Sequence, residues 1–271
     1  MATLLFYERP VPLNVDVHLK TRLGSLGANA GFAAKTNSIP LAAVEFVDTA
    51  REYPIAFTGQ EGGALFPIAL VGVRHNENLF VTADNRWDGR YIPAFVRRYP
   101  FVLAEKQGAD DFNVYIDEAY PGFGAADGER LFTDQGEHTP LLKQALEFLS
   151  TYQGEITRTR QFVDRLQSLD LLIPRVLEVV RNNEPPLILQ GFSVVDEQRL
   201  ADLADADLLA LAKEGYLALV YAHLGSLGNV TRLSERLDAR LMAVAASAEE
   251  AAEPAPSSKK KRSNGKEVQA D

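Results

Sequence analysis

The fold is decided by the stretch Ile55-Ala56-Phe57-Thr58-Gly59-Gln60-Glu61-Gly62-Gly63-Ala64-Leu65-Phe66-Pro67-Ile68-Ala69-Leu70-Val71-Gly72-Val73-Arg74. Within it, the apolar runs 55–57 and 66–74 have the length and composition of strands. The glycine-rich residues 59–63 between them lack the glycine frame, the following helix and the lysine that are typical of a phosphate-binding loop. Because glycine supplies the positive φ of tight turns, we predict that residues 59–63 connect two strands.

Similar short apolar runs continue through the N-terminal half, at residues 44–47, 79–82, 101–104 and 113–116. The polar residues 75–78 separate run 66–74 from run 79–82, which predicts a hairpin of these two segments. Together the runs predict a mainly antiparallel sheet over residues 43–117.

Helical patterns dominate the C-terminal half. Apolar residues recur at three- and four-residue spacings over 139–168, and Thr139-Pro140 suits the start of a helix. A second long helix, with one apolar stripe, is predicted over 216–246. Between them, residues 176–180 and 187–195 are predicted strands, and Asp196 and Asp205 are each predicted to start a short helix. Since strands come early and helices late, the predicted fold class is α+β, with the sheet packed against the C-terminal helices.

The chain divides into three parts by composition. Residues 1–40 are punctuated by proline and glycine and are expected to form an extended arm with turns. Residues 41–246 are expected to form a single α+β domain. Residues 247–271 carry few large apolar side chains and include Lys259-Lys260-Lys261-Arg262, so we predict a disordered tail.

The overall composition excludes several classes of function. The 271 residues carry a net charge of −9, which argues against a nucleic-acid partner and against docking on anionic lipid. The chain has no cysteine, and its closest histidines, His18 and His75, are 57 residues apart, so no metal site and no cofactor are predicted. No apolar run reaches the ~20 residues of a membrane span, and no secretory signal is recognised, so a cytoplasmic location is expected.

The strongest local pattern lies in residues 84–101. Trp87, Tyr91, Phe95 and Tyr99 are four residues apart and would share one side of a helix, with Arg90, Arg97 and Arg98 beside them. One interpretation is a pocket of aromatic faces and guanidinium groups for an anionic or peptide ligand. The other, which we favour, is an aromatic seam, with Trp87 buried and at least one of Arg97 and Arg98 paired with an acid.

The candidate ligand-binding residues are therefore Trp87, Tyr91, Arg97 and Arg98, together with His223 on the second long helix. A histidine packed at the flank of that helix is the simpler interpretation of His223.

The segment 87–101, together with Gly191-Phe192-Ser193-Val194-Val195-Asp196-Glu197 and Tyr221-Ala222-His223-Leu224-Gly225-Ser226-Leu227-Gly228-Asn229, resembles the SapC family of bacterial proteins. The resemblance runs from about Asn37 to about Leu237. The name of the family implies a link to bacterial surface layers, and the resemblance carries over no catalytic residue.

Three functions are compatible with these observations. The first, which the absence of a catalytic motif favours, is a non-catalytic accessory protein that binds a protein, a peptide or a small anionic ligand. The second is a surface-layer or envelope structural protein, as the family name implies. The third is an enzyme whose site is assembled from scattered residues such as His223, Asp196, Glu197 and Arg98.

Overall fold

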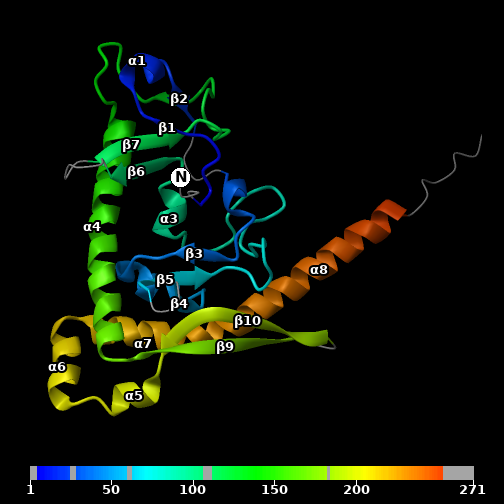
Figure 1. The fold of residues 1–271 in the computed structure, drawn as a ribbon. Coiled ribbons are helices and arrows are strands. Elements are labelled where there is room, and N and C mark those ends of the chain that lie inside the picture. Colours follow the sequence, from blue (N-terminus) through cyan, green and yellow to red (C-terminus); the bar gives the residue numbers. More distant parts are fainter. Residues whose placement is uncertain (1–4, 25–28, 60–62, 106–111, 182–183, 253–271) are drawn as a thin grey trace, which may run out of the picture.

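The computed structural model describes residues 5–24, 29–59, 63–105, 112–181 and 184–252. Its strands pair antiparallel in two larger sheets and one two-stranded sheet. Antiparallel sheets in the N-terminal half and helices in the C-terminal half confirm the predicted α+β class (Figure 1). The strands expected to form one sheet are, however, divided between two.

The smaller of the two main sheets has the strand order β1-β7-β6. Its strands are β1 (Pro10–Pro12), β6 (Phe101–Glu105) and β7 (Phe112–Asp117), and the strands predicted at 101–104 and 113–116 are thereby confirmed. Beside it, β2 (Arg22–Leu23) pairs with β8 (Glu129–Arg130). The helix α1 (Val15–His18) and the 3-10 helix η1 (Gly31–Ala33) also lie within the first 40 residues.

The five-stranded sheet has the order β3-β5-β4-β10-β9. Its strands are β3 (Ser38–Pro40), β4 (Ile55–Gly59), β5 (Leu65–Leu70), β9 (Leu172–Arg181) and β10 (Glu184–Val195). Strands β4 and β5 pair antiparallel on either side of the glycine-rich residues, so two strands do flank that turn. The predicted strands at 176–180 and 187–195 are confirmed and join the sheet through the register Ser193 to Phe57.

The predicted helix over 139–168 is confirmed as α4 (Pro140–Ser168), which runs alongside both main sheets (Figure 1). The Oγ1 of Thr139 accepts a hydrogen bond of 3.4 Å from the backbone N–H of Leu142, and Pro140 occupies the first helical position. Buried apolar residues form one cluster around each main sheet, and Phe6 and Phe32 pack against both clusters. Helix α4 and these two rings therefore join the two halves of the molecule.

Short helices follow the sheet, and the first two are those predicted from Asp196 and Asp205. They are α5 (Glu197–Ala201), α6 (Asp205–Lys213) and α7 (Tyr216–Ser226). Asp196 caps α5, because its Oδ1 accepts hydrogen bonds from the backbone N–H groups of Gln198 and Arg199.

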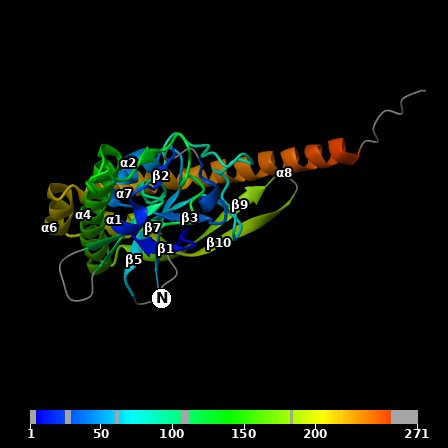
Figure 2. The same cartoon turned by 90° about the horizontal axis from the view of Figure 1, so that it is seen from above.

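The prediction of one continuous helix over 216–246 is wrong, because the 3-10 helix η3 (Leu227–Asn229) separates α7 from α8 (Val230–Ala252). Side chains at this point bond to other segments: Ser226 accepts from the backbone N–H of Ile55, and Asn229 donates to the carbonyl of Ala50. With two glycines, Gly225 and Gly228, the helix is also locally weak. Helix α8 and the β9–β10 hairpin project together from the body (Figures 1 and 2).

The strand predicted at 44–47 is wrong. These residues belong to the 3-10 helix η2 (Ala43–Glu45) and to α2 (Phe46–Thr49). The carboxylate of Glu45 accepts a hydrogen bond of 2.8 Å from the backbone N–H of Ala42, which caps the turn and stabilises helical geometry over a strand-like sequence.

The hairpin predicted from 66–74 and 79–82 is also wrong, because β5 ends at Leu70 and no strand pairing joins these two described segments. The backbone N–H of Leu79 donates to the carbonyl of Val71 at 2.8 Å, and Val81 forms an isolated bridge with Trp87. The chain turns sharply at Gly72, where an added Cβ would lie 1.9 Å from the carbonyl oxygen of Glu77. Only glycine permits this approach, and it ends the strand early.

The segment 84–101 does not form one helix. Only α3 (Ala94–Arg97) is helical, with Pro93 before it and Pro100 shortly after it. Proline restricts the residue before it and cannot donate within a helix, so the four aromatic residues do not share a helix face.

The tail predicted over 247–271 begins inside α8, and its residues 253–271 lie outside the described residues. Across the part of the chain that the structure describes, no helix is both long and apolar enough to cross a membrane.

Candidate functional site

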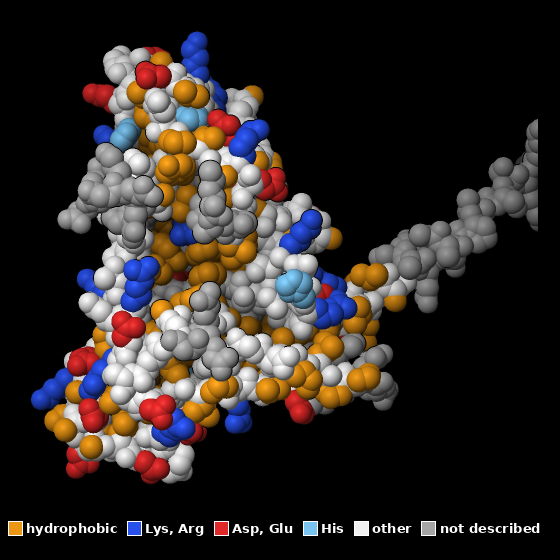
Figure 3. All heavy atoms as spheres, in the orientation of Figure 1, with side chains coloured by type: hydrophobic (Ala, Val, Ile, Leu, Met, Phe, Trp, Pro, Cys, Tyr) orange, Lys and Arg blue, Asp and Glu red, His pale blue; other side chains and the backbone are white. Residues whose placement is uncertain are grey.

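A groove with a volume of about 510 Å³ lies between α4 and the edge of the five-stranded sheet, and we call it the α4 groove. Its walls come from the end of β3, from β5, from α3 and from the second half of α4. On the face of the molecule drawn in Figure 3, hydrophobic side chains gather in the hollowed middle. A volume of this size falls within the ~300–1,000 Å³ range of small-molecule sites.

Helix α4 supplies one wall through residues that recur every three or four positions, namely Tyr152, Ile156, Thr159 and Val163. Thr159 also fixes the helix against η2, because its Oγ1 accepts a hydrogen bond of 2.8 Å from the backbone N–H of Ala43. The exposed side chains of Arg160 and Asp164 place polar groups at the outer rim. The wall is therefore apolar inside and charged at its opening.

The opposite wall comes from β5, through Leu65, Phe66 and Pro67. Phe66 is 46% exposed, although its neighbours Ile68 to Leu70 are buried. A large aromatic side chain that is left half open beside a groove is available to an apolar ligand.

Arg98 lies immediately after α3 and is the basic residue of the groove that is held against its aromatic rings. Its guanidinium carbon lies 3.9 Å from the ring centroid of Phe95 and 5.6 Å from that of Tyr152. Its buried Nε has no hydrogen-bond partner, and no carboxylate among the described residues forms an ion pair with it. A buried donor without a partner costs ~1–3 kcal/mol, so this position is prepared to receive an acceptor.

The positive charge of Arg98 acts on the hydroxyl groups around it. Burial raises the pKa of Tyr7 and of Tyr152, and the charge of Arg98 opposes that rise at both. At Tyr7, a side-chain hydrogen bond with Arg98 opposes the rise of the pKa as well. Arg98 also lines a second hollow, of about 160 Å³, with Phe101, Leu141 and Phe148. The guanidinium group thus stands between two apolar spaces along α4.

Arg97 is exposed and takes part in a different set of contacts. Its guanidinium lies 5.8 Å from the ring centroid of Tyr91 and 5.2 Å from that of Phe148, and its Nε donates to the carbonyl of Ile92 at 2.9 Å. No ion pair joins Arg97 to an acid among the residues that the structure describes. Among the described residues, aromatic faces rather than acids therefore contact the guanidinium groups of Arg97 and Arg98, and the expected pairing with an acid is not found there.

A buried carboxylate that the sequence analysis did not select organises this region. Glu45 is only 4% exposed, and its Oε1 accepts hydrogen bonds from the hydroxyl of Tyr91 at 2.8 Å and from the backbone N–H of Ala94 at 2.7 Å. Tyr91 is thereby fixed to η2. A signal for this role exists only in the spacing between Ala42 and Glu45, which matches half of a capping box.

Trp87 lies away from the α4 groove. Its ring stacks on Phe80 with centroids 6.2 Å apart, and its Nε1 donates to the hydroxyl of Tyr53 at 3.1 Å. It is partly rather than fully buried, so the expected burial is met only in part. With Arg97 it lines a separate hollow of about 270 Å³.

His223 lies in the core of the larger half. It is fully buried, and its ring packs edge-on against Phe57 with centroids 5.0 Å apart. The predicted site residues are thus brought together only in part. Tyr91 contacts Arg97, and Arg97 shares one hollow with Trp87 and another with Arg98, whereas His223 stands apart in the core. Asp196 and Glu197, considered for an enzyme site, lie at the start of α5, where Asp196 serves as the cap.

Within the described ranges, no three His, Asp or Glu side chains gather closely enough to hold a metal ion. The family model described as SapC matches residues 13–233 of the 271-residue chain, a span that contains every described wall of the α4 groove. No curated protein and no solved structure matches the chain.

Proposed function

The chain belongs to the SapC family, and from this premise and the geometry of the α4 groove we propose that it is a non-catalytic binding protein for a small amphipathic carboxylate. The apolar body of the ligand occupies the groove between α4 and β5. Its carboxylate accepts hydrogen bonds from Arg98.

The observation that carries this proposal is Arg98, which lines the aromatic groove and whose buried Nε has no hydrogen-bond partner. A carboxylate accepts two parallel hydrogen bonds from a guanidinium group, and such bonds strengthen where water is excluded. A neutral ligand satisfies the donor without compensating the positive charge. An anionic head group is therefore favoured over a neutral one.

The walls support an apolar body for the same ligand. Ile156 and Val163 on α4 face the groove together with Leu65 and the half-exposed Phe66 on β5. Covering these surfaces stabilises a complex by roughly 25 cal/mol per Å² of apolar area removed from water, before the costs of association.

The experiment compares decanoate with decanol, which has the same chain without the charge. Each is titrated into the full chain and followed by isothermal titration calorimetry. Decanoate is expected to bind at least tenfold more tightly than decanol, and Arg98→Met is expected to remove that preference. The matched control is Arg158→Met, because Arg158 lies on α4, which forms one wall of the groove, but is 74% exposed and pairs with Glu155 outside the groove.

Two results would overturn the proposal. One is equal affinity of the parent and of Arg98→Met for decanoate, with both variants folded by circular dichroism. The other is the absence of heat and of any thermal shift with saturated carboxylates of six to fourteen carbons.

A further inference from the structure

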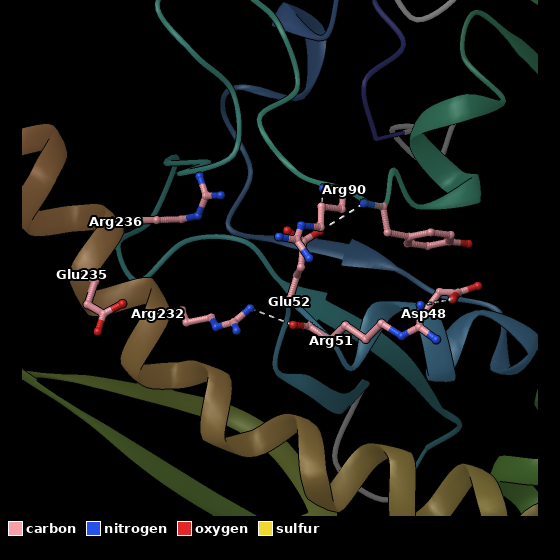
Figure 4. A pocket seen from close by; sticks show the side chains of 8 residues that line it. Asp48, Arg51, Glu52, Arg90, Arg232, Glu235 and Arg236 are labelled. Atoms are coloured by element: carbon pink, nitrogen blue, oxygen red, sulfur yellow. Dashed lines mark hydrogen bonds and ion pairs between the residues drawn. The ribbon is translucent and has the colours of Figure 1, made fainter.

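Another hollow, of about 590 Å³, lies between α2 and α8, and we call it the α2–α8 cleft. Figure 4 shows its walls: Arg232 and Arg236 come from α8, and Arg51, Glu52 and Arg90 come from the turn after α2 and from the loop before α3. These segments are far apart in the sequence. The cleft shares no lining residue with the α4 groove.

The lining of this cleft contains more arginine than acidic side chains, although the whole protein is acidic. Four arginine and three acidic side chains line it, whereas the whole chain carries a net charge of −9. Arg236 pairs with Asp88 outside the lining, so the other three arginines equal the three acids in number. Binding of an anion here therefore depends on which guanidinium donors are free, not on a net positive charge.

Two of the three acidic groups are already engaged. The Oε2 of Glu52 accepts hydrogen bonds from the backbone N–H groups of Arg90 at 2.7 Å and of Tyr91 at 3.0 Å. Asp48 lies 3.4 Å from Arg51, and because both side chains are more than half exposed, this ion pair is weak.

The arginines of the cleft differ in how many of their N–H donors already form hydrogen bonds. Arg236 is committed, because it bonds the carboxylate and the carbonyl of Asp88, each at 2.8 Å. Arg232 uses one nitrogen, Nη1, to reach the carbonyl of Arg51 at 2.8 Å. The side chain of Arg90 has neither an ion pair nor a hydrogen bond to any described residue. Arg90, Arg232 and Arg51 thus keep donors for a bound group.

We propose that the α2–α8 cleft binds the phosphate group of a small phosphorylated molecule. Guanidinium groups present planar pairs of N–H donors that match the oxygens of a phosphate, and a dianion needs more than one such group. Arg51 and Arg90 reach it from the body and Arg232 reaches it from α8. The bound phosphate therefore also fastens α8 to the body.

The test uses inorganic phosphate as the probe with the full chain, at constant ionic strength set by sodium chloride. Isothermal titration calorimetry measures affinity, and hydrogen exchange of the backbone amides in residues 230–240 measures the docking of α8. Parent protein is expected to bind phosphate with slower exchange in α8. Arg90→Gln and Arg232→Gln are each expected to weaken binding at least tenfold.

The control is Arg86→Gln, which removes the same charge from an arginine that is 72% exposed and pairs with Asp84 outside the cleft. It is expected to change affinity less than twofold. An equal loss in the control and in the cleft variants shows a general charge effect and overturns the proposal, as does the absence of binding to the parent at millimolar phosphate. Failure here leaves the carboxylate titration at Arg98 unaffected, because the two hollows are separate.

Discussion

The backbone N–H of Val195 donates a hydrogen bond of 3.0 Å to Nε2 of His223, which joins the end of β10 to α7 inside the core. The acceptor nitrogen must be unprotonated, so the neutral ring carries its proton on Nδ1. Burial lowers the pKa of His223 to about 4, and the backbone of Ile55 opposes that shift only in part. The histidine is therefore a neutral acceptor at physiological pH, which suits a structural role.

The burial of His223 makes stability depend on pH in a defined direction. The unfolded chain binds a proton at His223 with a pKa near 6.5 and the folded chain only near 4. The stabilising contribution is thus complete above pH 6.5 and is lost progressively as the pH falls toward 4, by about 2 kcal/mol between pH 7 and pH 5. Urea unfolding at these two pH values measures the change.

His223→Gln is the informative variant, because an amide oxygen accepts from Val195 without titrating. We expect it to show about 2 kcal/mol less pH dependence than the parent over the same interval. His223→Phe removes the acceptor and is expected to be less stable at both pH values. Identical pH profiles for parent and His223→Gln would exclude this account.

A second prediction concerns the buried carboxylate of Glu45. Its oxygens accept from Ala42, Tyr91 and Ala94, so Glu45→Gln turns one end into a donor that faces another donor. We expect a loss of about 2–3 kcal/mol in the free energy of unfolding. Tyr91→Phe removes a single bond to the charged group and is expected to cost about 1.5 kcal/mol. The urea unfolding midpoints of the two variants show which substitution is more destabilising. A loss of stability in Tyr91→Phe that equals or exceeds the loss in Glu45→Gln contradicts the prediction.

Gly89 gives a third prediction, with an optical signal attached. A Cβ at this position would lie 2.3 Å from the hydroxyl of Tyr53 and 2.9 Å from Nε1 of Trp87. Tyr53 cannot yield, because it is fully buried and its hydroxyl donates to the carbonyl of Tyr91 at 2.6 Å. Gly89→Ala is expected to destabilise by about 1–3 kcal/mol through overpacking.

Trp87 is the single tryptophan of the chain, so its emission reports on this site without interference. Gly89→Ala is expected to shift that emission to longer wavelength. Gly154→Ala is a suitable control, because a Cβ at Gly154 meets nothing within 4 Å. If Gly89→Ala changes neither the emission spectrum nor the stability, the packing of Tyr53 and Trp87 does not require glycine at position 89.

Local signals predicted the elements that local interactions specify. The periodicity and the Thr139 cap predicted α4, alternation predicted β9 and β10, and Asp196 was recognised as a cap. Each of these elements is determined by residues within a few positions of one another.

Long-range contacts explain what the sequence analysis missed. Glu45 becomes important because Tyr91 and Ala94, more than 40 residues later, donate to it. Arg98 lines the α4 groove because α4 places Tyr152 across from it, and the aromatic spacing of residues 84–101 pointed instead to a single helix. Neither pairing leaves a periodic trace in the sequence, because the partners belong to different elements.

The last prediction tests whether Arg98, which we propose binds the ligand, lowers the stability of the folded protein. In the parent, a guanidinium group is held against Phe95 with its Nε buried and without a partner, which costs free energy in the folded state. Methionine has similar reach, carries no charge and packs well against aromatic rings, so Arg98→Met keeps the contact and removes the cost. We expect its free energy of unfolding to lie within about 1 kcal/mol of the parent or above it, because binding sites commonly sacrifice stability for function. Urea unfolding monitored by circular dichroism measures this. A loss of more than about 3 kcal/mol would show instead that Arg98 is a structural cation whose removal strands a partner.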